Sequence, residues 1–224
     1  EPGGRDDERP LHRVRISKAF YLGKYQVTQE QWQAVMGNTP SGFKGDDLPV
    51  EKISWDDCHK FCSELSAKAG KTVRLPTEAE WEYACRAGST GKFCFGDNDS
   101  DLDAYAWYNS NSIGMSHPVG QKKANAWGLY DMHGNVWEWC NDWYGSYSSG
   151  SQVDPKGASS GTSRVLRGGS WSFNPTYCRA ADRVKPDPAV HGAPDVVVPN
   201  RDGSEVQRGR PGRAPGHRVA SLPG

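Results

Sequence analysis

The chain has 224 residues, with 27 basic and 27 acidic side chains, so its formal net charge is zero. This length predicts one large domain or two small ones. A general nucleic-acid binder or a binder of anionic membranes would need a surplus of lysine and arginine, so we expect neither kind of partner. No run approaches the roughly 20 apolar residues of a membrane span. No N-terminal segment has the pattern of a signal peptide, and the sequence therefore assigns no compartment.

Aromatic residues divide the chain into two parts. The sequence contains 9 Trp, 9 Tyr and 6 Phe, and none of them lies beyond Tyr177. Proline and glycine become frequent from Pro186 onward. We therefore expect a core-forming domain over residues 1–185 and a Pro/Gly-rich segment over residues 186–224.

Capping patterns predict three short helices, which cover Thr28–Met36, Ser54–Ala69 and Thr77–Ala87. Each begins with Ser or Thr, whose hydroxyl can accept from a backbone N–H of the first turn. The first and third helices have Gln or Glu three residues later, as in a capping box. A glycine follows each pattern, at Gly37, Gly70 and Gly88, and predicts the helix end.

Strands are predicted only in short pieces, at His12–Ile16, Phe20–Val27 and Arg164–Leu166. The last of these runs into Gly168-Gly169, which indicates a bulge or tight bend. The long stretch from Gly88 to Gly161 has little periodicity and many Gly, Asn, Asp and Ser residues. We therefore expect an α+β chain with much irregular structure.

Four longer motifs resemble the formylglycine-generating enzyme (sulfatase-modifying factor) family. One reads Gly-Leu-Tyr-Asp-Met-His-Gly-Asn-Val-Trp-Glu-Trp, and in chain order the four are Phe20–Thr28, Val73–Ala84, Gly128–Trp139 and Arg164–Trp171. The resemblance covers roughly residues 10 to 185. It implies a C-type-lectin-like variant fold, which is compact, loop-rich and low in regular secondary structure.

The same family fold is implied to serve different functions. Some members oxidise a sulfatase cysteine to formylglycine with copper and dioxygen, and two cysteines follow their Gly-Gly-Ser motif. The first cysteine lies three residues after the serine, and the second lies five residues further on. Their thiolates bind the copper, because soft sulfur ligands suit Cu(I). Counted from Ser170, these positions are Phe173 and Cys178 in this chain. A benzyl side chain cannot bind copper, so the resemblance favours a member without oxidase activity.

Our first hypothesis is a module that binds a protein or peptide ligand. Other family members are variable proteins of diversity-generating retroelements, which bind ligands with the C-terminal part of the fold. The most specific version of our hypothesis is that this chain is such a variable protein. Aromatic and small polar side chains supply contact area at low entropic cost. By resemblance, the ligand-facing residues here are Ser172, Phe173, Asn174, Thr176, Tyr177 and Asp182.

Two alternatives stay open. In the first, the chain is a copper oxidase that converts a peptidyl cysteine through Cys178, with another group as the second copper ligand. In the second, the chain is a structural or regulatory domain of a larger protein. Either would have the same four motifs.

The turn between Asp131 and Glu138 predicts a structural Ca²⁺ site. By resemblance to the family's second calcium site, its ligands are Asp131, Gly134, Val136 and Glu138. Two side chains can supply carboxylate oxygens and the other two residues main-chain carbonyls, which are the hard ligands that calcium prefers. The alternative is a metal-free turn in which Glu138 accepts from local N–H groups.

The two ends of the chain carry the remaining expectations. The acidic run Asp6–Glu8 is expected to lie in solvent. By resemblance, the final strand of the fold would cover residues 215–220, which include Gly216-His217-Arg218-Val219. About 25 to 30 residues would then be inserted between Val190 and Pro215, and a loop of that length is usually functional or disordered.

Overall fold

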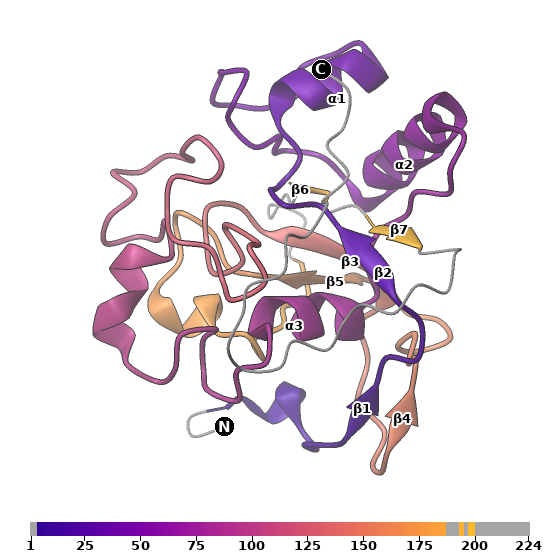
Figure 1. Cartoon of the computed structure of the whole chain (residues 1–224), viewed down its shortest axis with the longest axis vertical. Coiled ribbons are helices and arrows are strands. Elements are labelled where there is room, and N and C mark those ends of the chain that lie inside the picture. The colour runs from indigo at the N-terminus through magenta and orange to yellow at the C-terminus, as the bar shows by residue number, and fades with distance from the viewer. Residues whose placement is uncertain (1–3, 187–192, 195–196, 200–224) are drawn as a thin grey trace.

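The computed structural model describes residues 4–186, 193–194 and 197–199 (Figure 1). Three α-helices are α1 (Gln29–Met36), α2 (Trp55–Ala69) and α3 (Glu78–Arg86). The short 3₁₀ turns are η1 (Asp6–Glu8), η2 (Asp99–Ala104) and η3 (Pro175–Cys178). The strands are β1 (Val14–Arg15), β2 (Phe20–Leu22), β3 (Glu138–Trp143), β4 (Gln152–Val153), β5 (Arg164–Arg167), β6 (Ala193–Pro194) and β7 (Val197–Pro199). The predicted α+β class with little regular structure is confirmed.

The three helices begin where the capping patterns predict. Thr28, Ser54 and Thr77 each accept from the backbone N–H three residues later, and in all three the side chain at that third position bonds back to the cap. Helices α1 and α2 end at glycines in the left-handed region. Helix α3 ends earlier than predicted, because Ala87 takes that conformation with φ of 45°, one residue before Gly88.

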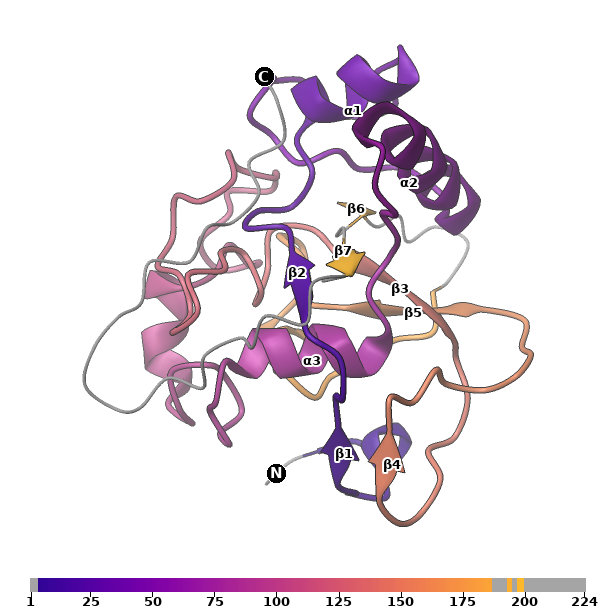
Figure 2. The same ribbon diagram turned by 45° about the vertical axis from the view of Figure 1, so that its right-hand side comes forward.

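Three small sheets connect segments that are far apart in sequence. The largest has the order β5-β3-β6, in which β3 pairs antiparallel with β5 and parallel with β6. Strand β2 pairs antiparallel with β7, and β1 pairs parallel with β4. In Figures 1 and 2, α1 and α2 lie together above the sheet, while β1 and β4 form a separate arm below α3.

Strand β3 is absent from the sequence-based expectations, and it is the middle strand of the largest sheet. Four of its six residues are buried, and they lie on both faces of the strand, so no alternation of polar and apolar positions marks it. Strand β2 is also shorter than the predicted Phe20–Val27. The expected strand at residues 215–220 lies outside the described residues.

Strands β6 and β7 lie beyond the composition break at Pro186. Register pairs join Glu138 to Ala193 and Tyr21 to Val198. These pairs join part of the predicted C-terminal segment to strands β2 and β3.

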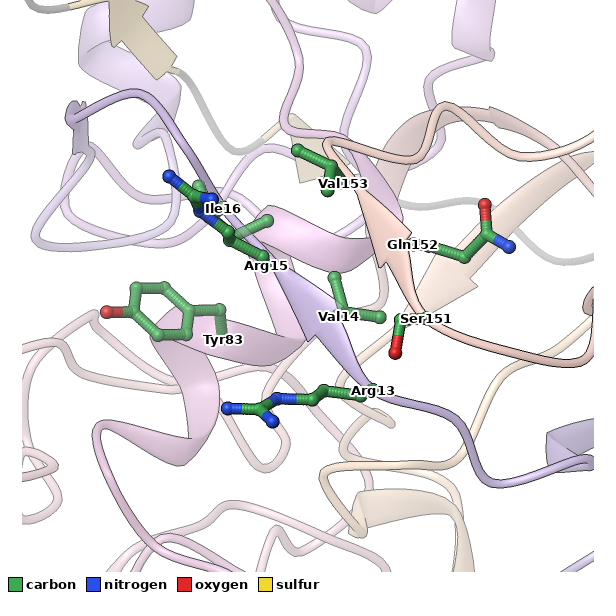
Figure 3. Close-up of a pocket in the computed structure, with 8 residues that line it drawn as sticks. All are labelled: Arg13, Val14, Arg15, Ile16, Tyr83, Ser151, Gln152 and Val153. Carbon is green, nitrogen blue, oxygen red and sulfur yellow. The ribbon is translucent and has the colours of Figure 1, made fainter.

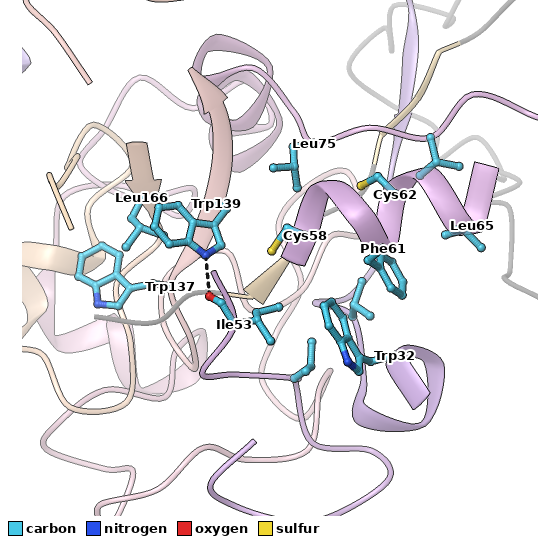
Figure 4. Close-up of a cluster of buried hydrophobic side chains, with 13 residues drawn as sticks. Trp32, Ile53, Cys58, Phe61, Cys62, Leu65, Leu75, Trp137, Trp139 and Leu166 are labelled. Atoms are coloured by element: carbon cyan, nitrogen blue, oxygen red, sulfur yellow. Dashed lines mark hydrogen bonds between the residues drawn. The ribbon is translucent and has the colours of Figure 1, made fainter. Parts of the chain in front are cut away.

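Aromatic rings fill the main core, as the composition indicates. Trp32 stacks on Phe61 with ring centroids 5.1 Å apart, between α1 and α2. The Trp139 indole N–H donates to the Ile53 carbonyl at 3.1 Å (Figure 4). All six cysteines are free thiols, and all except Cys94 are buried. No helix in the described part of the chain is both long and apolar enough to cross a membrane.

Candidate functional site

Two of the predicted ligand-facing residues, Phe173 and Tyr177, line a cavity of about 260 Å³. The other lining residues are Arg5, Trp137, Tyr144, Val184 and Lys185. The rings of Phe173 and Tyr177 meet edge-on with centroids 5.0 Å apart, and Phe173 also meets Trp137 edge-on at 5.2 Å. Edge-to-face contacts of this kind are the favoured arrangement of aromatic pairs. The cavity therefore has an aromatic wall of three rings.

Glycines after β5 direct the chain toward this wall. Gly168 and Gly169 have φ of 94° and 77°, in the left-handed region that other residues avoid. A Cβ atom on Gly169 would lie 2.8 Å from the Cys178 sulfur, so the close approach of these two segments requires glycine. Asn174 then caps η3 by accepting from the Thr176 N–H at 3.0 Å, and this turn places Tyr177 beside Phe173.

The six predicted ligand-facing residues take three kinds of position. Phe173 and Tyr177 are half-buried in the cavity wall. Exposed small polar side chains stand next to them, at Ser172, Asn174 and Thr176. Asp182 differs from the prediction, because it is wholly buried. The surface available to a ligand is therefore Ser172 to Tyr177 without Asp182.

Asp182 instead contacts two cations, one of which, Arg5, lines the cavity. Its carboxylate accepts from the Arg5 guanidinium at 3.2 Å and lies 3.5 Å from that of Arg179. Burial nevertheless raises its pKa to about 7, because desolvation of the carboxylate outweighs the attraction of Arg5 and Arg179. Asp182 therefore changes its protonation state near neutral pH.

We expect Asp182→Asn to flatten the pH dependence of stability. A carboxyl whose pKa is raised on folding binds its proton more tightly in the folded state, so its stabilising contribution is lost as pH rises through about 7. Between pH 5 and pH 8 the wild type should lose about 2 to 3 kcal/mol more than the variant in urea unfolding. Arg5 and Arg179 keep Asp7 and Glu8 as partners, so neither cation is left alone. Asp46→Asn, at an exposed position, should keep the wild-type slope; an equal slope in Asp182→Asn would contradict this account.

Two residues of the N-terminal acidic run, Asp7 and Glu8, are partly buried and differ from their predicted place in solvent, whereas Asp6 is exposed as predicted. Glu8 forms a two-point ion pair with Arg179, with one contact at 3.0 Å, and both side chains are nearly buried. Asp7 accepts from the Tyr144 hydroxyl at 2.5 Å and from Arg5 at 2.9 Å. These contacts join the N-terminal segment to Tyr144 and Arg179. Charge patterning alone does not predict such long-range pairs.

The surviving cysteine of the copper motif lies in a buried cluster. Cys178 is fully buried among apolar and aromatic side chains, which include Phe93, Leu102 and Tyr108. Burial raises the pKa of its thiol far above the ordinary range, which disfavours the thiolate that copper requires. Phe173, at the other ligand position, packs against Trp137 and Tyr177. The structure therefore brings no thiol pair together at these two positions.

His133 fixes the backbone of Cys178 from behind. Its Nε2 accepts from the Cys94 backbone N–H at 3.0 Å, so Nδ1 donates to the Cys178 carbonyl at 2.8 Å. Burial lowers the pKa of His133 to about 4, and the ring is neutral at physiological pH. The imidazole is thus a structural bridge between two loops.

A buried ion-pair network positions the chain on both sides of the segment Ser172–Tyr177. Glu78, at the start of α3, accepts from Arg167 at 3.0 Å and from Arg183 at 2.8 and 2.9 Å. Arg167 also donates to the carbonyls of Ala180 and Asp182. Strand β5, which precedes Ser172–Tyr177, and Arg183, which follows it, therefore both bind the Glu78 carboxylate.

Each of the four predicted calcium ligands has an oxygen near one point, but the oxygen of Asp131 is its main-chain carbonyl and not the predicted carboxylate. That point is the side-chain nitrogen of Gln26, which lies 2.9 to 3.4 Å from an oxygen of each of the four residues: Asp131, Gly134, Val136 and Glu138. Within the described ranges, no group of three or more His, Cys, Asp or Glu side chains could bind a metal ion. Calcium stays a prediction for these residues.

Sequence patterns alone did not identify Arg5, Tyr144, Val184 and Lys185 as cavity residues. Trp137 lies in a family motif, but none of the other four belongs to a motif or a periodic pattern. Only Val184 and Lys185 carry a signal in the sequence, because they closely follow the predicted ligand-facing residues Ser172 to Asp182. Arg5 is 168 positions from Phe173, and only the fold brings the two together.

A larger hollow of about 500 Å³ lies away from this site, between the β1–β4 pair and α3 (Figure 3). The side chains of Arg13 and Arg15 lie on either side of Tyr83, which is 51% exposed. None of the sequence-predicted site residues lines this hollow. Its position therefore does not coincide with the motifs.

Comparison with known families now places the chain. The family model described as the sulfatase-modifying factor enzyme 1-like domain matches residues 1–194. The chain belongs to this family. The resemblance of the four sequence motifs to sulfatase-modifying factors is thereby confirmed.

Relatives in the sulfatase-modifying factor family have different names and lengths. The chaperone protein LppX of Paenibacillus barcinonensis is 34% identical, and the match covers 68% of this chain and 69% of that protein. The formylglycine-generating enzyme of Mus musculus is 36% identical over 75% of this chain and 46% of its own. That of Streptomyces coelicolor is 37% identical over 62% and 48%. The chain thus spans about half the length of the formylglycine-generating enzymes that it matches.

Solved structures that share the fold include a variable protein and PvdO. Treponema denticola variable protein 1 superposes with a TM-score of 0.81 at 35% identity, covering 88% of this chain and 90% of its own. PvdO from Pseudomonas aeruginosa superposes with a TM-score of 0.74 at 28% identity, covering 89% and 88%. The irregular, C-type-lectin-like fold of this family is therefore the fold of this chain.

Proposed function

We propose that the chain is a non-oxidase member of the sulfatase-modifying factor family that binds a protein or peptide ligand. The ligand would contact the aromatic wall formed by Trp137, Phe173 and Tyr177, and the exposed polar side chains of Ser172, Asn174 and Thr176. Two cationic side chains stand at the cavity, Arg5 and the exposed Lys185. Aromatic anchors next to small polar groups are typical of protein-recognition surfaces.

The observation that carries this proposal is the position of Phe173. Phe173 stands where the family's copper oxidases have their first copper-binding cysteine, and its ring forms part of the cavity wall. The remaining cysteine faces a buried cluster and is protonated at neutral pH. One substitution thus removes a metal ligand and adds an apolar contact surface at the same place.

The similar proteins support a binding role. One of the similar structures is that of a variable protein, and one of the relatives is named a chaperone. Diversification by a retroelement is the sharpest form of the proposal, because variation in Ser172–Tyr177 would alter exposed side chains without altering the core. A gene neighbourhood with neither a reverse transcriptase nor a near-copy of the 3′ end of this gene would remove that form.

Two other functions are weighed against it. The chain is 32% identical to the serine/threonine-protein kinase pkn1 of Chlamydia caviae, over 84% of this chain and 33% of that protein. This match supports a regulatory domain of a longer protein as a second candidate. The copper oxidase, with Cys178 and another ligand, is the enzyme alternative that the burial of Cys178 disfavours.

A turnover assay separates binding from oxidation. The chain is loaded with Cu(I), and oxygen consumption is followed with a Cys-x-Pro-x-Arg peptide as substrate. We expect no consumption above that of Cys178→Ala, because the thiol is buried and the second thiolate is missing. Turnover that Cys178→Ala abolishes would overturn the binding-module proposal.

A further inference from the structure

The side-chain amide of Gln26 lies in the centre of the oxygen cluster that the family resemblance assigns to calcium. Its nitrogen is 2.9 Å from the Val136 carbonyl and 2.9 Å from a Glu138 carboxylate oxygen. It is also 3.3 Å from the Gly134 carbonyl and 3.4 Å from the Asp131 carbonyl. Gln26 is 2% exposed, and these are long-range contacts to residues 105 to 112 positions away.

The identity of these neighbours fixes which end of the amide points inward. All four contacted atoms are oxygens that can only accept, so the NH₂ end and not the carbonyl end must face them. Its two hydrogens are best matched to the two shortest contacts, at Val136 and Glu138. The amide therefore supplies partial positive charge where several acceptors converge.

The two acidic side chains are arranged accordingly. The second carboxylate oxygen of Glu138 accepts from the Trp81 indole N–H at 2.5 Å, so both of its oxygens have neutral donors. The Asp131 carboxylate is not among the four oxygens: its Oδ2 accepts from the Gly120 N–H at 2.8 Å, and its Oδ1 is buried without a hydrogen-bond partner in the described part of the chain. Four oxygens surround the central point and only one of them is a carboxylate oxygen, whereas calcium takes 6 to 8 oxygens at about 2.3–2.6 Å.

We propose that Gln26 takes the place of the calcium ion in this chain, so that the Asp131–Glu138 turn is held together without metal. An amide nitrogen 2.9 to 3.4 Å from these four oxygens fills the point at which the ion would be bound. The turn precedes β3 and contains Trp137 of the cavity wall. Gln26 thereby links the segment between β2 and α1 to the candidate site.

The test compares wild type with Gln26→Glu, by thermal unfolding in EDTA and in millimolar CaCl₂. The wild-type midpoint should be the same in both, and the purified protein should contain no stoichiometric calcium by elemental analysis. Gln26→Glu adds a carboxylate to an acceptor cluster, so it should be destabilised in EDTA and regain roughly 5 to 10 °C with calcium. Tb³⁺ should bind this variant and show luminescence sensitised by the nearby Trp81.

Gln33→Glu, at an exposed position on α1, is the matched control and should be insensitive to calcium. A wild-type chain that binds one calcium, or that EDTA destabilises, would overturn the proposal. A folded Gln26→Glu variant that responds to neither Ca²⁺ nor Tb³⁺ would also overturn it, because the amide would then not lie in a cation-binding cluster. Should Gln26→Glu fail to fold even with calcium, the wild-type calcium content decides the question alone.

Discussion

Glu78→Ala is expected to lower the free energy of unfolding by about 3 to 5 kcal/mol, the usual cost of breaking a buried ion pair. Glu78 is 3% exposed, and the two arginines that donate to it, Arg167 and Arg183, are 1% and 2% exposed. Removal of the carboxylate leaves these guanidinium groups buried with less compensating charge. Urea unfolding measures the loss, which corresponds to a thermal midpoint roughly 6 to 20 °C lower.

Glu82→Ala is the matched control on the same helix. Its side chain is 29% exposed and also accepts from Arg167, but Arg167 keeps Glu78 when Glu82 is removed. We expect a cost of about 1 kcal/mol, as for partly exposed pairs. Equal costs for the two variants would contradict the view that Glu78 joins β5 to Arg183 on the other side of the Ser172–Tyr177 segment.

Phe173→Ala is expected to weaken binding of a peptide ligand by at least about 10-fold, and Tyr177→Ala by a similar factor. Truncation of a central aromatic anchor typically costs about 2 kcal/mol or more, which is roughly 30-fold in the dissociation constant. Both rings belong to one cavity wall, so the two losses should not be additive. Fluorescence polarisation of a labelled peptide measures them.

Two controls separate loss of binding from loss of folding. Phe173→Leu keeps most of the side-chain volume, so it should retain the wild-type melting temperature more closely than Phe173→Ala. Ile113→Ala removes an apolar side chain that is 86% exposed and does not line the cavity, so it should bind as the wild type does. Weakened binding by Ile113→Ala would place the ligand elsewhere.

Local signals in the sequence predict the helices well and the sheet poorly. The capping residues of α1, α2 and α3 act within four positions, so a sequence pattern contains all of the information that they need. Strand β3 is defined by β5 and β6, which lie 20 to 60 positions away, and its burial on both faces removes the usual alternation. Its existence depends on its partners and not on its own residues.

The candidate site shows the same division. The family resemblance places Phe173 and Tyr177 in one ligand-facing segment, and the structure places both rings in one cavity wall, because η3 and the glycines before it are local features. The burial of Asp182 follows from cations that come from different segments, above all Arg5. The acceptors of the Asp131–Glu138 turn are local and predictable, but their donor, Gln26, comes from more than 100 residues away.

The central claim, that the Phe173 cavity binds a polypeptide, is tested most directly by a selection followed by a titration. A displayed random-peptide library is selected on the immobilised chain, and an enriched peptide is titrated against the wild type and Phe173→Ala. We predict an enriched peptide whose dissociation constant rises at least about 10-fold in the variant. A failure to enrich any peptide, or equal dissociation constants for a folded Phe173→Ala variant and the wild type, would contradict the claim.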